Sequence, residues 1–135
     1  MASFNKFNRF VEDLAEKVHN LGSDQLTIAL TNTAPSAANA VLADITQISY
    51  TNLSSRNITT VSSSQTSGTY KLVLQDLVLS ATGTVATFRY VILYNDTATS
   101  DNLIGWYDYG QSVTLLDGET FTIDFDGTAG ALTIA

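Results

Sequence analysis

The sequence predicts a mainly β protein: an antiparallel, jelly-roll-like β-sandwich with one N-terminal amphipathic α-helix. Thr, Ser, Val, Ile, Leu and Tyr are abundant and charged residues are few, as is typical of β-rich domains. Beyond Gly22 the spacing of apolar residues changes from the helical period to the period of two expected for strands. About eight short strands then follow at intervals of about ten residues, separated by Gly, Asp and Ser.

A chain of 135 residues is enough for one domain. We therefore expect the helix over residues 1–22 and a single β-sandwich over residues 23–135. Ser3 is a candidate N-cap of the helix and Gly22 a candidate C′ residue. Apolar residues at spacings of three and four form the helical stripe: Phe4, Phe7, Val11, Leu14, Val18 and Leu21, with Phe10 beside them.

A stripe of this size has to leave water, because each buried residue of this kind contributes roughly 1.5–3 kcal/mol. The second half of the helix, residues 14–21, is tethered to the first strand, so we expect it to pack on its own sandwich. The first turns are freer and carry more aromatic surface than a helix end needs. We therefore predict that Phe4, Phe7 and Phe10 lie at a subunit contact.

The strands are expected in segments with alternating or continuous apolar residues. The segment 25–31 predicts a half-buried strand, and 59–69 a polar edge strand with its turn at Gly68. The segment 85–94 has apolar residues on both faces, so we expect it to be covered on both sides. Residues 40–50 are compatible with a short helix or an irregular strand. Further strands are expected over 70–79, 103–109, 112–116, 119–125 and 131–134.

The string Asp-Phe-Asp-Gly-Thr near the C-terminus resembles the nucleophile loop of haloacid-dehalogenase phosphatases. In those enzymes the loop follows the first strand of a parallel sheet, and later strands supply further catalytic groups. Here only residues 127–135 follow Asp126, so those groups have no place. The ligand pattern and closing Glu of a calcium-binding EF-hand are also missing. We interpret the string as a strand end with Asp124 facing outward and a turn at Asp126 and Gly127.

No other pattern predicts catalysis, and we expect no enzyme, cofactor or metal site. His19 is the only histidine and there is no cysteine, so a His-based triad or a His/Cys metal site cannot be assembled within one chain. In the segment GWYDYG, alternation sends Trp106 and Asp108 to one side and Tyr107 and Tyr109 to the other. These aromatic residues form either core and cross-strand packing or a sugar-binding platform.

Charge excludes nucleic acid as a partner. The net charge is −7, and beyond Gly22 only Arg56, Lys71 and Arg89 oppose the carboxylates. Nucleic-acid binding needs clustered Lys and Arg to replace counterions. The N-terminus lacks the apolar core of a signal peptide and no run is long enough to span a bilayer, so we expect a protein made in the host cytosol with no membrane partner.

The order of these segments resembles a family of small structural proteins encoded in the virion-morphogenesis region of tailed bacteriophages. The resemblance covers nearly the whole chain, and its most specific stretches are LTNTAPSAANAVLADI and FRYVILYND. It implies a capsid cement (decoration) protein on the virion surface, bound to the major capsid protein and homo-oligomeric. The interface candidates are Phe4, Phe7, Phe10, Trp106, Tyr107 and Tyr109. Two alternatives remain: a tail or neck subunit, and a carbohydrate-binding module.

Overall fold

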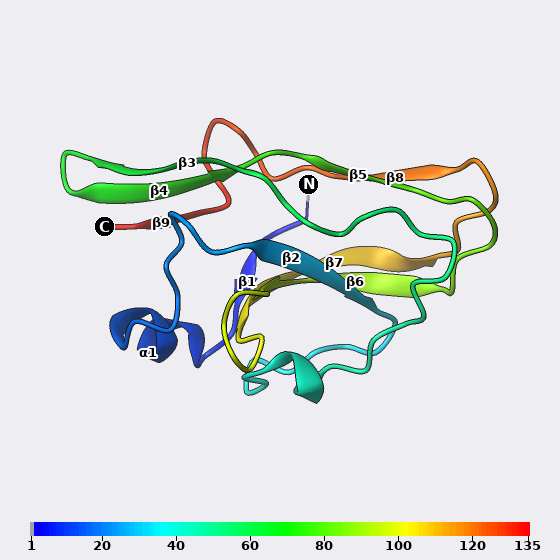
Figure 1. Ribbon diagram of the computed structural model, residues 1–135, viewed down its shortest axis with the longest axis horizontal. Helices are drawn as coiled ribbons and strands as arrows, with labels where there is room; N and C mark the ends of the chain where they lie inside the picture. Colours follow the sequence, from blue (N-terminus) through cyan, green and yellow to red (C-terminus); the bar gives the residue numbers. More distant parts are fainter. Residues whose placement is uncertain (1) are drawn as a thin grey trace.

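The computed structural model describes residues 2–135, which form a sandwich of two β layers with a third layer of loops and helix (Figure 1). The central layer is a four-stranded sheet in the order β1-β7-β6-β2. Every strand pair found in residues 2–135 is antiparallel, which confirms the predicted fold class. The strands of the central sheet are β1 (Asn5–Lys6), β2 (Leu26–Thr31), β6 (Phe88–Asn95) and β7 (Leu103–Val113).

The upper layer consists of two small sheets that continue each other, β3-β4-β9 and β5-β8. Two interruptions of the strands separate them: residues 75–76 between β4 and β5, and residues 124–131 between β8 and β9. The Asp76 carboxylate bridges these interruptions by accepting a hydrogen bond from the Phe125 amide at 2.9 Å. The strands of this layer are β3 (Thr60–Thr66), β4 (Thr69–Leu74), β5 (Leu77–Ser80), β8 (Thr120–Ile123) and β9 (Leu132–Ile134).

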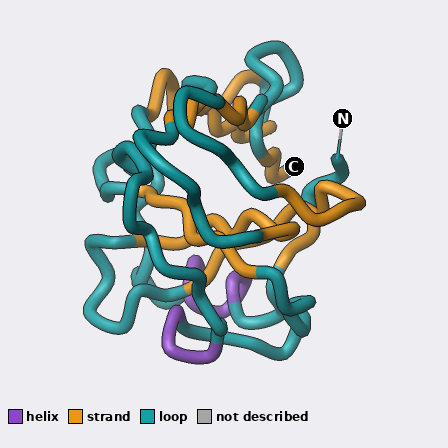
Figure 2. The backbone as a smooth tube through the Cα atoms, turned by 90° about the vertical axis from the view of Figure 1, so that its right-hand side faces the viewer, coloured by secondary structure: helices purple, strands orange, loops and turns teal. Residues whose placement is uncertain are grey.

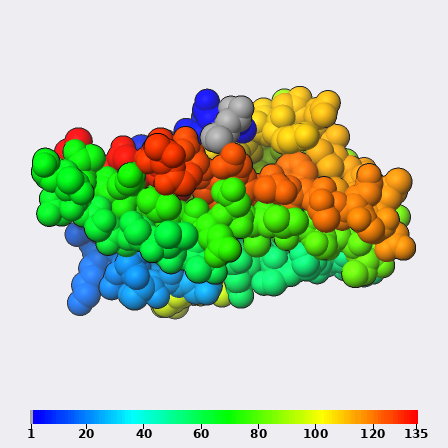
Figure 3. All heavy atoms as spheres, turned by 90° about the horizontal axis from the view of Figure 1, so that it is seen from above, coloured from blue at the N-terminus to red at the C-terminus, as the bar shows by residue number. Residues whose placement is uncertain are grey.

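The third layer covers the other face of the central sheet. It contains the single α-helix of the described chain, α1 (Phe10–Ala15), the 3-10 helix η1 (Leu42–Asp44) and long loops. Figure 2 shows these purple helices on the opposite side of the central strands from the upper layer. Asp44 fixes the start of η1, because its carboxylate accepts hydrogen bonds from the backbone amides of Ala40 and Val41. Seen from above, the upper sheets and the loop between β8 and β9 form the outer surface (Figure 3).

The central sheet is buried on both faces, as expected for residues 85–94. In β2, buried positions do not alternate with exposed ones, because all six residues are buried. The larger apolar cluster lies between the two β layers and includes Leu26, Ile28, Leu30 and Leu93. The smaller cluster lies between the central sheet and the third layer, and contains Phe7, Ala29, Ile45, Ile92, Tyr94 and Leu103. The prediction that 25–31 is only half-buried is therefore wrong.

The outer edge of β2 is sealed by the chain itself. The Ile28 amide donates to the Arg56 carbonyl at 3.1 Å, and the Ile58 amide donates to the Leu26 carbonyl at 3.0 Å. The Leu30 amide donates to the Tyr50 hydroxyl at 3.0 Å. Segment 48–58 thus satisfies the backbone groups that an edge strand would otherwise expose.

The expected 22-residue helix is limited to Phe10–Ala15, because the preceding residues form β1. Asn5 pairs with Trp106 and Lys6 with Gly105, so the chain is extended there. Lys17 has a φ of 69°, a left-handed conformation that ends the helical turn. The predicted stripe is also wrong within α1, since Val11 is 53% exposed while Asp13 is 1% exposed.

Asp13 is buried because it holds the helix to the loop before β7. Its carboxylate accepts a hydrogen bond from Arg9 Nε at 3.1 Å and another from Asn102 Nδ2 at 2.9 Å. A buried carboxylate needs such partners, since an unpaired charge is costly away from water. Helical periodicity alone gives no sign of this contact.

The remaining elements match the sequence with changed bounds. The polar edge strand expected over 59–69 is confirmed as β3, with the turn before β4 at Gly68. The strand expected over 70–79 is two strands, and those expected over 103–109 and 112–116 form one strand, β7. Residues 40–50 contain η1. No helix within residues 2–135 is long and apolar enough to cross a membrane.

Phe7 fills the space between the central sheet and the third layer, so its truncation tests whether the N-terminal segment belongs to the core. We expect Phe7→Ala to lower the free energy of unfolding by about 3–5 kcal/mol, through lost burial and a residual cavity. Urea unfolding followed by circular dichroism measures it. The exposed Val61→Ala is the control and should stay within about 0.5 kcal/mol. A Phe7→Ala effect as small as that of the control would contradict the packing.

Candidate interaction surface

The sandwich is open along one side, where the edge strands β1 and β9 line a common cavity of about 810 Å³. β1 is the edge strand of the central sheet and β9 the edge strand of the β3-β4-β9 sheet, so no strand of the described chain connects the two layers here. Helix α1 forms the third wall. We call this opening the seam, and its large apolar lining residues are Phe4, Phe10, Val11, Leu14, Leu132 and Ile134.

The seam exposes large apolar side chains to water. Val11 is 53% and Ile134 41% exposed, which places both among the large apolar residues most accessible to water. Within residues 2–135, Lys6 is the one charged residue that lines the cavity. Lys6 has no ion-pair partner in that part of the chain. The protein has a net charge of −7, but no Asp or Glu of the described chain lines the seam.

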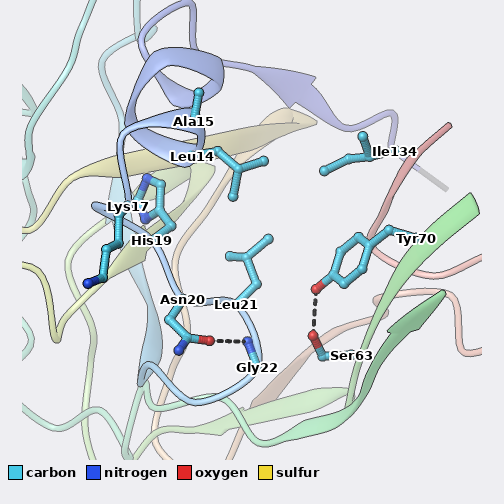
Figure 4. Close-up of a pocket in the computed structure, with 10 residues that line it drawn as sticks. All are labelled: Leu14, Ala15, Lys17, His19, Asn20, Leu21, Gly22, Ser63, Tyr70 and Ile134. Atoms are coloured by element: carbon cyan, nitrogen blue, oxygen red, sulfur yellow. Dashed lines mark hydrogen bonds between the residues drawn. The ribbon is translucent and has the colours of Figure 1, made fainter.

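A second cavity of about 450 Å³ adjoins the seam and shares Leu14, Ala15 and Ile134 with it. Figure 4 shows Leu14, Leu21 and Ile134 pointing toward its middle, while Lys17 extends away from it. On the far wall, the Tyr70 and Ser63 hydroxyls are hydrogen bonded at 2.7 Å.

Two of the predicted aromatic residues lie along the same open side. Tyr107 and Tyr109 line a smaller cavity of about 170 Å³ together with Phe121 and Ala2. Tyr109 packs against Phe121 with ring centroids 5.0 Å apart, and Tyr107 against Phe4 at 5.8 Å. Burial raises the pKa of Tyr107 to about 12. Tyr107 is thus a packed residue, and Tyr109 is the exposed end of this aromatic row.

Phe7 and Phe10 are not at the surface, and the structure corrects their assignment to a subunit contact. Phe7 is fully buried in the smaller cluster against Trp106, with ring centroids 4.7 Å apart. Phe10 is buried in the larger cluster. The N-terminal segment crosses the edge of the central sheet, so successive Phe residues reach opposite faces. Phe4 alone of the three remains partly accessible, on the wall of the seam.

The alternation expected in GWYDYG is confirmed. Trp106 packs with the smaller cluster and Tyr107 with the larger one. Asp108 accepts two hydrogen bonds from the Arg89 guanidinium, at 2.8 and 3.1 Å. These bonds, helped by the Gly110 amide, lower the pKa of Asp108. Trp106 is half-buried against Phe7 and lies on the opposite face from Tyr109, so the two rings do not form one platform.

The Asp-Phe-Asp-Gly-Thr string forms the loop between β8 and β9. Phe125 points into the core, while the Asp124 carboxylate accepts a hydrogen bond from the Asp126 amide at 2.9 Å. Asp126 accepts hydrogen bonds from the amides of Ala129 and Thr128, which lower its pKa. Both carboxylates are thus bound to their own loop. Residues 2–135 contain no group of three or more His, Cys, Asp or Glu residues placed to hold a metal ion.

His19 lies behind the cavity of Figure 4 and is 5% exposed. Its Nδ1 atom is 3.0 Å from Asn95 Nδ2. Asn95 Oδ1 accepts from the amides of Thr97 and Ala98, so Nδ2 has to face His19 as a donor. His19 Nδ1 is therefore the acceptor and Nε2 carries the proton, without a partner among residues 2–135. Burial lowers the pKa of His19, against the opposing effect of Asp13 and Asp24.

Most of the seam could not be predicted from the sequence. Helical spacing places Val11 in the buried stripe, and alternation places Leu132 and Ile134 in a strand without assigning it a role. The one signal for the seam is topological, because β9 has a neighbour, β4, on one side only. Comparisons with protein-family models, curated proteins and solved structures give no match to this chain.

The buried, neutral His19 makes stability depend on pH. Because its folded pKa lies below the ordinary 6.5, the stabilisation is complete above pH 6.5 and is lost as the pH falls toward the folded pKa. The slope reaches at most about 1.4 kcal/mol per pH unit. Asp108 and Asp126 have lowered pKa values and titrate below the ordinary Asp value of 3.8, outside this range.

Urea unfolding between about pH 7.5 and pH 5 measures this dependence. We expect the stability of the wild-type protein to fall on acidification, and that of His19→Gln to stay nearly level. Equal pH dependence in both proteins would show that His19 is not its source.

Proposed function

We propose that this protein is a non-enzymatic virion structural protein of a tailed bacteriophage, and that it acts as a capsid cement protein on the outside of the head. The observation that carries the proposal is the seam: an open side of a small β-sandwich, with Val11 and Ile134 exposed in an apolar cavity. Exposed apolar surface of this kind marks a site of association. The resemblance of nearly the whole sequence to small phage structural proteins supports the setting.

The charge distribution supports a position away from DNA. The net charge of −7 disfavours contact with packaged nucleic acid, while the polar Ser and Thr surface suits shallow contacts repeated over a lattice. Each such contact can be weak, because many copies held on one particle gain from multivalency. The partner in this proposal is the major capsid protein, with further copies of this chain as neighbours.

A position in the tail or neck is the second candidate, since the same open side would serve between ring subunits. Copy number separates the two: a cement protein is present in hundreds of copies per particle and a neck protein in few. The third candidate, a carbohydrate-binding module, would use the exposed Tyr109 of β7, and binding of the protein to a glycan array would support it.

To test the proposal, purified protein is added to expanded heads of the encoding phage that were assembled without this protein. We expect saturable, stoichiometric binding and a higher temperature of head disruption, because a ligand that binds only the intact shell stabilises it by mass action. Quantitative gel analysis and differential scanning calorimetry measure the two effects. Recovery of the protein in purified tails, with no binding to heads, would contradict the cement role and favour the tail or neck position.

A further inference from the structure

We propose that the seam accepts an extended segment of a partner protein, which adds to β9 as a further strand and alternates apolar with acidic residues. The proposal rests on the proposed function in taking the partner to be a neighbouring virion protein. It goes beyond that function in stating where the partner binds and what chemistry it presents. Three observations define this partner: a free strand edge, an apolar cavity beside it and a single lysine.

The free edge of β9 indicates that the occupant is a strand. β9 pairs with β4 on one side, and beyond this pairing residues 132–134 make no hydrogen bond within residues 2–135. The edge of β2, by contrast, is sealed by the amides and carbonyls of segment 48–58. An unsealed edge offers backbone donors and acceptors to an incoming chain, which is the basis of recognition by strand addition.

The cavity beside the edge indicates that alternate side chains of the added strand are apolar. Because side chains of a strand point alternately to its two faces, every second residue would point into the space between β9 and α1. Val11 and Ile134 lie there with about half of their surface exposed, and Leu14 and Phe4 complete the wall. Filling this space removes apolar surface from water on both partners.

Lys6 indicates an acidic residue in the partner. It lies on β1, across the cavity from β9, and has no ion pair within the described chain. A carboxylate next to an apolar strand residue would meet it at the rim of the seam. Electrostatic complementarity of this kind sets orientation and selects the partner more than it adds affinity.

The opposite edge of the same sheet in a second copy, β3, does not have the chemistry that fits the seam. The opposite edge strand of the same sheet, β3, reads Thr-Val-Ser-Ser-Ser-Gln-Thr and carries one large apolar residue and no carboxylate. Where β3 reaches the wall of a cavity, it does so with the polar residues Thr60 and Ser63. The two edges of the β3-β4-β9 sheet therefore differ, because β9 combines pairing groups with an apolar groove and β3 offers a polar strand.

The test uses the intact protein and short fluorescent peptides in which valine alternates with glutamate and threonine. The comparison peptides carry lysine for glutamate, or N-methyl groups on alternate amides that remove the backbone donors. Fluorescence polarisation measures binding, and amide NMR shifts locate it. We expect the acidic peptide to bind, to shift Thr133, Ile134 and Lys6, and to lose about tenfold or more in affinity on N-methylation. Equal binding of the acidic and lysine peptides would overturn the role of Lys6.

Matched variants distinguish peptide binding at the seam from non-specific hydrophobic binding. Val11→Glu should weaken peptide binding by about tenfold, and Val78→Glu, which alters an equally exposed valine on β5, should leave it unchanged. Lys6→Glu should reverse the preference between acidic and lysine peptides. No saturable binding, or shifts confined to other strands, would overturn the proposal.

Sedimentation velocity with the same variants tests whether a second copy of this chain occupies the seam instead. Self-association of the wild-type protein that Val11→Glu abolishes would overturn the proposal in favour of a second copy. None of these measurements uses phage heads, so a negative peptide result would contradict the strand-addition proposal and leave the cement role unaffected. Absence of head binding together with intact peptide binding would contradict the cement role and leave the strand-addition proposal unaffected.

Discussion

Burial of the central sheet on both faces is the constraint from which the rest of the structure follows. A sheet of four strands with apolar residues on both sides needs two covers. The upper sheets supply one cover, and the N-terminal segment with the 40–50 region supplies the other. Phe7 and Ile45 therefore belong to the core although they lie outside the β-sandwich proper. The helix in this cover, α1, has only six residues.

The same arrangement leaves one side of the sandwich unfinished. On the β2 side, the chain returns along the edge and pairs with it over 48–58. On the other side, the N-terminal segment crosses the edge of the central sheet at β1 and continues into α1, so no strand among residues 2–135 spans the gap to β9. Asp13 and His19 fix this crossing through Asn102 and Asn95. The opening is thus a consequence of how the third layer is attached, and it is held in place by buried polar contacts.

Period and composition were sufficient to predict where the strands after Gly22 lie, though not all of their bounds, and to predict the polar edge strand β3 and the double-sided burial of β6. They failed at the N-terminus because Phe4, Phe7 and Phe10 have helical spacing but reach different faces of a sheet, which only the pairing of Asn5 with Trp106 reveals. For the same reason, only some of the interface candidates lie at the surface: Tyr109 is exposed on the open side, whereas Phe10 is buried in the core. Ile134 has no local signal at all, since its exposure depends on which strand lacks a neighbour.

Native-state hydrogen exchange, read residue by residue, tests most directly whether the N-terminal segment is a wall of the core. We predict that the amides of Phe7 and Asp13 exchange only through global unfolding, as slowly as those of β2 and β6, because these amides are hydrogen bonded and both residues are buried. The edge strand β9 should exchange faster, through local opening. Rapid exchange at Phe7 and Asp13 while β2 and β6 stay protected would contradict this packing, since the segment would then be detachable from the sheet that it covers.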